Sequence, residues 1–152
     1  MELLTRTERW NITYQHALGE VASWFFTQIR DHGKIYGRRC ADSKRVLVPP
    51  RAFSDETLEP TKEWVEVGPG GKIEAFTIVY ESFQNLPDPP YAFGYVTLDG
   101  ADTAIGGFFK GIDLSDPKRA ANELKIGTRI ETRFAEQRKG DVLDFWFELS
   151  RN

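Results

Sequence analysis

The sequence predicts a mainly β chain in which an N-terminal helix and a small hairpin precede a five-stranded barrel. Residues 14–32 carry apolar side chains at helical spacing, which predicts the helix. Pro49 and Pro50 end a short strand-like hairpin, because proline cannot donate to a strand ladder. After residue 64 come five longer segments rich in β-branched and aromatic residues, with a helical segment between the third and the fourth.

The size and composition of the chain are those of one small globular domain with an appendage. It has 152 residues, of which 40% are hydrophobic and 13% aromatic, so a core can form. Its single cysteine excludes an internal disulfide framework. Because the sequence has neither an apolar run of about 18 residues nor a signal-peptide pattern, we expect a cytoplasmic protein that does not enter a membrane. A net charge of -3 argues against general nucleic-acid binding.

The N-terminal segment 1–33 divides into an arm and a helix. Residues 1–13 are polar and charged, so we expect a mobile or partner-dependent arm. The helix predicted over 14–32 has an apolar stripe and ends before Gly33. That stripe consists of Leu18, Val21, Ala22, Phe25 and Ile29. Trp24 and Phe26 flank it, so the helix either packs on its own domain or docks with its excess aromatic surface onto another protein.

A small hairpin region is predicted over residues 34–63. Ile35 and Tyr36 begin one extended piece, residues 46–48 form the other, and residues 41–44 form the turn. The polar and acidic residues 54–63 are typical of a surface loop. This region is too small to hold a core of its own and must pack against its surroundings.

Residues 64–152 are predicted to form the barrel, with a short strand at 64–67 leading into it. The five long strands are predicted at 72–80, 91–98, 103–110, 128–135 and 141–149. Asp116 and Pro117 are a helix cap and a first-turn residue for the helical segment within 111–127. Gly106 and Gly107, in the middle of the third strand, indicate a bulge or a strong bend. This element order is that of an OB-fold.

The sequence offers no convincing catalytic constellation. His16 and His32 lie roughly 24 Å apart if the helix is continuous, so they cannot serve one site. Arg38 and Arg39 would favour a Cys40 thiolate, but no histidine is near in sequence to activate it. We therefore expect no catalytic residue and no enzyme activity of its own.

The predicted hairpin carries the one local concentration of positive charge. It consists of Lys34, Arg38, Arg39, Lys44, Arg45 and Arg51. It is either a solvated hairpin surface or an anion site, for example for a nucleotide diphosphate. Phe108, Phe109 and Lys110 could imitate the stacking platform of a nucleic-acid-binding barrel, but acidic residues crowd the neighbouring loops.

The run IYGRRCADSKRVLVPPRAFSDET resembles the rubredoxin-like zinc ribbon of small acyl-CoA-associated OB-fold proteins. The resemblance continues through PYAFGYVTLDG at 90–100, FFKGID at 108–113 and LKIGTRIETRF at 124–134, so it covers about residues 14–149. In that family a helical arm precedes a ribbon with four zinc-binding cysteines, and an OB-fold follows. The four ligand positions fall on Cys40, Ser43, Ser54 and Thr57.

Three of these four positions carry hydroxyl side chains, which are poor ligands for structural zinc. Asp42, Asp55 and Glu56 are displaced by one residue and suit harder ions. We therefore expect a degenerate ribbon without zinc. We expect packing to hold this ribbon together, by Tyr36, Val46, Val48 and Phe53.

The resemblance implies a non-catalytic accessory subunit that binds a thiolase-type enzyme, or a related aldolase or acyltransferase, and helps to form its acyl-CoA site. Its partner surface would be the helix residues Trp24, Phe25, Phe26 and Ile29. The CoA would be met by Arg38, Arg39, Lys44, Arg51 and Phe53, with no tightly bound cofactor. The alternatives are a stand-alone acyl-CoA binder or a partner of an enoyl-CoA hydratase and, more remotely, a nucleic-acid-binding OB module.

Overall fold

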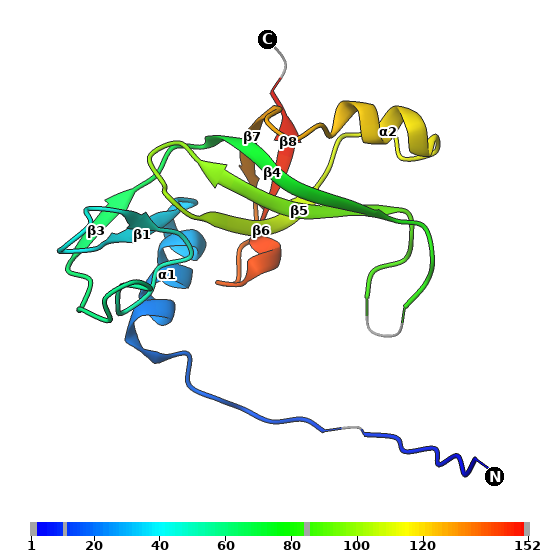
Figure 1. Cartoon of the computed structure of the whole chain (residues 1–152), viewed down its shortest axis with the longest axis horizontal. Helices are drawn as coiled ribbons and strands as arrows, with labels where there is room; N and C mark the ends of the chain where they lie inside the picture. Colours follow the sequence, from blue (N-terminus) through cyan, green and yellow to red (C-terminus); the bar gives the residue numbers. More distant parts are fainter. Residues whose placement is uncertain (1–2, 11, 84–85, 151–152) are drawn as a thin grey trace.

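The computed structural model describes residues 3–10, 12–83 and 86–150. A helix, α1, and a three-stranded sheet lie beside a closed barrel, and the N-terminal arm runs away from both (Figure 1). Every described arm residue up to Leu18 is exposed and outside secondary structure. The predicted arm at 1–13 lies partly outside the described residues, and so does the stretch between the predicted strands at 72–80 and 91–98.

The α1 helix spans Gly19–His32 and begins five residues later than the sequence predicts. Gly19, the first residue of α1, has a φ of 77°, so the helical backbone does not extend before it, and Tyr14 and Leu18 lie exposed in the arm. The predicted end is confirmed, because Gly33 adopts the left-handed conformation and its amide donates to the Ile29 carbonyl at 3.0 Å.

The hairpin region forms a sheet of three strands in the order β2-β1-β3, with β1 at Tyr36–Arg39, β2 at Val46–Leu47 and β3 at Glu63–Glu66. The third strand differs from the prediction, which assigned residues 64–67 to the barrel region. It pairs antiparallel with β1 instead, with Trp64 opposite Arg38. The chain turns toward the barrel only after this strand, at Gly68 and Pro69.

The barrel closes in the order β4-β5-β6-β8-β7, with β6 and β8 parallel, and this is the topology of an OB-fold. The predicted five-stranded OB barrel is thus confirmed. Its strands are β4 at Gly70–Val79, β5 at Tyr91–Leu98, β6 at Ala104–Phe109, β7 at Arg129–Phe134 and β8 at Phe145–Leu149. The α2 helix, Pro117–Glu123, lies between β6 and β7, and its first amides donate to the Asp116 carboxylate as the sequence predicts.

Of the bulge or strong bend predicted at Gly106 and Gly107, the bulge is wrong, because β5 and β6 pair through both glycines without a register shift. The shift lies in β4 between Ile73 and Ala75. Gly107 serves close packing instead: a Cβ there would lie 2.7 Å from the ring of Phe147, which fills the barrel interior.

The start of the last predicted strand is also wrong, since Val142–Asp144 form a short 3-10 helix, η1. Asp144 is buried, and its carboxylate accepts the backbone N–H groups of Lys139, Gly140 and Asp141 at 2.6–3.0 Å. Burial alone would raise the pKa of Asp144, but these donors stabilise the charged form and lower it. The turn is therefore built around one buried carboxylate.

The turn between β5 and β6 attaches the small sheet to the barrel. Asp102 accepts the Val46 amide at 2.7 Å, and the Thr103 hydroxyl lies 2.7 Å from the amide and 2.9 Å from the carbonyl oxygen of Val48. One apolar core continues from α1 and the small sheet into the barrel. Among the described residues, no helix has the length and apolar character needed to cross a membrane.

Candidate functional site

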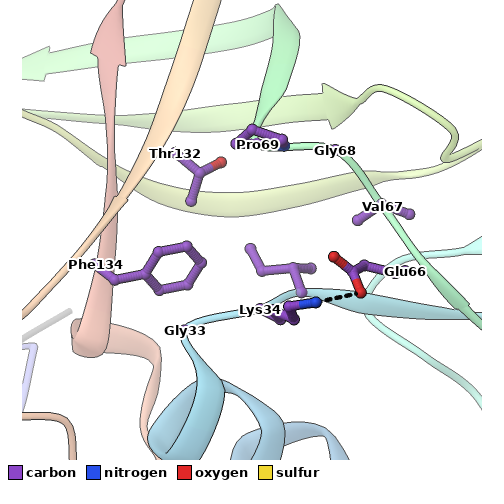
Figure 2. Close-up of a pocket in the computed structure, with 9 residues that line it drawn as sticks. Gly33, Lys34, Glu66, Val67, Gly68, Pro69, Thr132 and Phe134 are labelled. Carbon is purple, nitrogen blue, oxygen red and sulfur yellow. Dashed lines mark hydrogen bonds and ion pairs between the residues drawn. The ribbon is translucent and has the colours of Figure 1, made fainter.

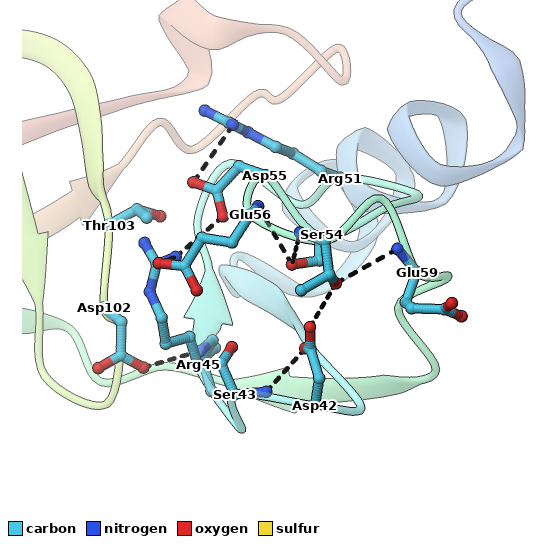
Figure 3. Close-up of polar contacts among 12 residues, drawn as sticks. Asp42, Ser43, Arg45, Arg51, Ser54, Asp55, Glu56, Glu59, Asp102 and Thr103 are labelled. Carbon is cyan, nitrogen blue, oxygen red and sulfur yellow. Dashed lines mark hydrogen bonds and ion pairs between the residues drawn. The ribbon is translucent and has the colours of Figure 1, made fainter.

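Polar contacts hold together the two turns that carry the degenerate zinc-ligand positions. Figure 3 shows two of these positions, Ser43 and Ser54, among their polar neighbours. The Thr57 hydroxyl donates to the Asp42 carboxylate, which also accepts the Ser43 amide at 2.7 Å. These donors lower the pKa of Asp42, the Thr57 hydroxyl most strongly. The Ser54 hydroxyl accepts two backbone amides of its own turn, at 3.3 and 3.4 Å.

These residues do not fit a structural zinc ion. Cys40 is the one thiol at the four positions and is fully buried, whereas Ser43 and Thr57 are exposed. Across the described residues, no group of three or more His, Cys, Asp or Glu side chains could hold a metal. Phe53, which we expected to pack inside the ribbon, is 55% exposed because it lies at the rim of a hollow rather than in the core.

The basic residues of the hairpin region are paired rather than gathered into a bare patch. Arg39 donates to Glu63 at 2.9 Å, and Lys44 donates to the Ala41 carbonyl at 2.7 Å. Arg51 lies 3.6 Å from Asp55. Arg45 contacts both Asp55 and Glu56, at 2.9 and 2.8 Å, in the cluster that Figure 3 shows. Local carboxylates therefore offset much of the positive charge that the sequence suggested for CoA.

Among the predicted CoA residues, Arg39 donates to the Lys44 carbonyl at 3.0 Å, and Arg38 and Phe53 share a hollow of about 340 Å³ between α1 and the small sheet. Trp24 lines the same hollow. The Arg38 guanidinium is held by Thr61, whose carbonyl oxygen it reaches at 2.5 Å, and it covers the Trp64 ring at 4.8 Å. The Nε and Nη2 groups of Arg38 are thus already hydrogen-bonded within the chain.

The predicted partner surface on α1 is partly wrong. Phe25 and Ile29 are 3% and 0% exposed, because they pack into the shared core, so they offer a partner almost no surface. Trp24 is half-buried against the small sheet. Phe26 is the remaining member, and it lines an apolar hollow on the barrel side of α1.

An apolar surface that we did not predict as a site lies on the outer side of β5 and β6. Tyr91, Phe93, Tyr95 and Phe108 alternate outward from these strands, and we call them the aromatic face. Phe108 contacts Tyr91 and Phe93 edge-on, with ring centroids 5.8 and 5.4 Å apart. Gly106 leaves room for two of the rings, since a Cβ there would lie 3.0 Å from Phe93 and 3.4 Å from Tyr95.

Two apolar hollows border the aromatic face. The helix hollow, about 310 Å³, lies between α1, the Pro49–Pro50 turn and the barrel. The loop hollow, about 510 Å³, lies where the loops after β4 and β6 meet the barrel. The neighbouring η1 residues Val142 and Leu143 line one hollow each and are 57% and 62% exposed. The aromatic face, the hollows and η1 thus form one extended apolar surface, which we call the docking surface.

The docking surface is suited to apolar contact rather than to chemistry. Lys110 is the one charged residue that lines either hollow, and its ammonium lies 3.9 Å from the centroid of the Trp146 ring. Strands β5 and β6 are the second and third of the barrel, where OB-folds commonly bind ligands. An oligonucleotide needs a basic groove beside its stacking rings, and one lysine does not supply it. The surface therefore favours an apolar ligand or another protein.

Comparisons with known proteins agree with the barrel topology. Residues 64–135 match the family model described as the C-terminal OB-fold domain of ChsH2. The barrel of this chain is therefore similar to that OB-fold domain. The match runs from β3 to the end of β7, and β8 then closes the ChsH2-type barrel. No curated protein is similar enough in sequence to count as a match.

Two solved structures share the fold over most of the chain. A structure named "Ltp2-ChsH2(DUF35) aldolase" is 17% identical, has a TM-score of 0.66, and aligns with 89% of this chain and 98% of its own. A protein of unknown function from the DUF35 family of Sulfolobus solfataricus is 16% identical, with a TM-score of 0.63 and coverage of 87% of each chain. The helix, small sheet and ChsH2-type barrel therefore form an arrangement shared with DUF35 proteins.

Proposed function

We propose that this chain is a non-catalytic accessory subunit that binds a thiolase- or aldolase-like enzyme of lipid metabolism through the docking surface. The observation that carries the proposal is the extent of this surface, which stays exposed although the core is complete without it. Its prominent exposed members are Tyr95 at 51%, Val142 at 57% and Leu143 at 62%. Large exposed apolar patches mark sites where proteins bind other proteins or apolar ligands. The similar ChsH2 structure is named together with an aldolase, which supports this choice of partner.

The groups that could act as nucleophile or base are badly placed for catalysis by this chain alone. Cys40 is fully buried under the small sheet and lines neither hollow of the docking surface. His16 is exposed in the arm before α1, and His32 is exposed in the last turn of α1. A nucleophile needs a base within hydrogen-bond distance, and these three residues supply no such pair. The catalytic groups would come from the partner.

The same proposal includes a share in the partner's acyl-CoA site. The helix and loop hollows have apolar walls that would accept an acyl chain, and Lys110 at the rim of the loop hollow could face an anionic group. Arg38 and Phe53 lie in the separate hollow beside Trp24, while Arg39, Lys44 and Arg51 lie around the hairpin turns. We therefore expect acyl contacts on the docking surface, and phosphate contacts only where a partner displaces a local carboxylate.

Complex formation with a thiolase- or aldolase-like enzyme from the native host tests the proposal. Wild-type protein should co-elute with that enzyme in size-exclusion chromatography with light scattering. The double variant Tyr95→Ser/Val142→Ser should bind at least ten-fold more weakly, because it removes two exposed apolar contacts near the centre of the surface.

The matched control is Ile126→Ser, which removes a side chain that is 71% exposed and lines neither hollow. It should bind like the wild type. Equal binding by the double variant, with the melting temperature of all three proteins unchanged, would place the interface elsewhere. A chain that binds acyl-CoA alone and no enzyme would favour the stand-alone binder.

A further inference from the structure

A further cavity lies where α1, the small sheet and the barrel meet, and we call it the junction cavity (Figure 2). It encloses about 230 Å³ and shares no lining residue with the hollows of the docking surface. Its lining comes from Gly33–Ile35 after α1, from Glu66–Pro69 between β3 and β4, and from Thr132 and Phe134 of β7.

Thr132 gives this cavity an unused hydrogen-bonding group. The residue is 5% exposed, and its hydroxyl has no hydrogen-bond partner among the described residues. Figure 2 shows the hydroxyl directed into the space beside Pro69 and Phe134. A buried hydroxyl without a partner destabilises the folded state, and valine would have the same shape without that cost. The Thr132 hydroxyl is therefore suited to form a hydrogen bond with a polar group of a bound ligand.

The rest of the cavity shows what kind of ligand fits. Its walls are apolar, formed by Ile35, Val67, Pro69 and Phe134. At the rim, the Lys34 ammonium donates to the Glu66 carboxylate at 2.8 Å, and the Tyr36 hydroxyl donates to the same oxygen at 3.0 Å. Because Lys34 and Glu66 neutralise one another at the rim, the cavity has no net charge to offset a charged ligand, so an uncharged ligand is favoured.

We propose that the junction cavity binds a small uncharged secondary amide. Its carbonyl oxygen would accept the Thr132 hydroxyl, its N–H would face the acceptor side of the Lys34–Glu66 pair, and its alkyl groups would lie against Phe134 and Ile35. At about 30 Å³ for each water-sized atom, the cavity holds roughly seven non-hydrogen atoms.

N-propylacetamide, which has this size, is the probe. Titrated into the full ¹⁵N-labelled chain, it should shift the amide signals of Lys34, Val67, Gly68 and Thr132 saturably in two-dimensional NMR spectra. The ketone 2-hexanone, in which a methylene group replaces the N–H, should bind at least three-fold more weakly. Shifts spread over the whole spectrum, or no saturation, would overturn the proposal.

Two variants separate a ligand role of the hydroxyl from a structural one. Thr132→Val should weaken probe binding at least five-fold and raise the melting temperature without probe by about 2–4 °C, since it removes an unpaired buried hydroxyl. Thr132→Ser should keep most of the affinity. Equal affinity of Thr132→Val and wild type would overturn the proposal. That outcome would leave the proposed accessory function untouched, because the docking surface does not include the junction cavity.

Discussion

Trp24 of α1 stacks on Trp64 of β3, with ring centroids 3.8 Å apart and 24° between the ring planes. Tyr36 meets the Trp24 ring edge-on at 5.1 Å, and the Arg38 guanidinium covers Trp64. Trp24, which was expected to face a partner, thus fastens the helix to its own small sheet. The surface left for a partner lies on the barrel side.

Replacing Trp24 with alanine should lower the free energy of unfolding by about 2 kcal/mol, because a stacked ring pair and the buried area of an indole are lost together. Urea denaturation followed by circular dichroism measures this change. The control Trp10→Ala alters a ring that is 78% exposed in the arm and should leave stability unchanged. A neutral Trp24→Ala would mean that the ring pair does not hold the helix in place.

Gly107→Ala should lower the free energy of unfolding by about 2 kcal/mol, since the new methyl group would press against Phe147 in a filled barrel. Gly106→Ala adds the same methyl group one residue away, where it meets the rings of the outer aromatic face. Those rings can move outward, so this control should cost less than about 1 kcal/mol. Thermal unfolding of the two variants compares them, and equal losses would contradict the inward role of Gly107.

Chelation by EDTA should leave the melting temperature unchanged, because the turns at the former zinc positions are held by protein contacts. Thr57→Val, which removes the hydroxyl that donates to Asp42, should lower it by about 2 °C. Elemental analysis of the purified protein provides the second readout. Near-stoichiometric zinc, or a large drop in melting temperature with EDTA, would show that a metal holds the ribbon.

Acid should destabilise the turn built around Asp144. Its pKa is lowered in the folded state, so its stabilising effect is complete above the unfolded pKa, near about 3.9, and is lost as the pH falls through the folded value. Asp144→Asn should therefore cost about 2 kcal/mol at pH 7 and less as the pH falls below about 4. Asp88→Asn, at an exposed loop position, is the control. A constant difference between wild type and Asp144→Asn from pH 7 to pH 2 would contradict this account.

Local patterns in the sequence were enough to predict the barrel. The β5 strand at 91–98 and the helix capped by Asp116 match their predicted positions, because alternation and capping are short-range properties. The partner of β3 could not be predicted in this way, since pairing with β1 depends on contacts almost thirty residues apart. Likewise, no local pattern showed that carboxylates such as Glu63 and Asp55 pair with the basic cluster.

The sequence shows the alternation of Tyr91, Phe93 and Tyr95, but it does not show whether these rings point into the barrel or away from it. The intervening residues, Ala92, Gly94 and Val96, are apolar as well, so either set could have faced the core. The small set faces inward because Phe109 and Phe147 already fill the narrow barrel. Gly94 and Val96, which pair with Gly107 and Ile105, are the smaller residues of the alternation. Their small size is the sequence signal that could have shown which side of β5 faces the core.

The most direct test of the accessory role is the acyl-CoA turnover of a thiolase- or aldolase-like enzyme from the native host, measured with increasing amounts of the chain. We predict that the chain alone has no activity and that wild-type protein raises the enzyme's rate saturably. The double variant Tyr95→Ser/Val142→Ser should need at least ten-fold more protein for the same rate, and Ile126→Ser should behave like the wild type. Turnover by the chain alone, or an enzyme rate that does not depend on it, would contradict the account.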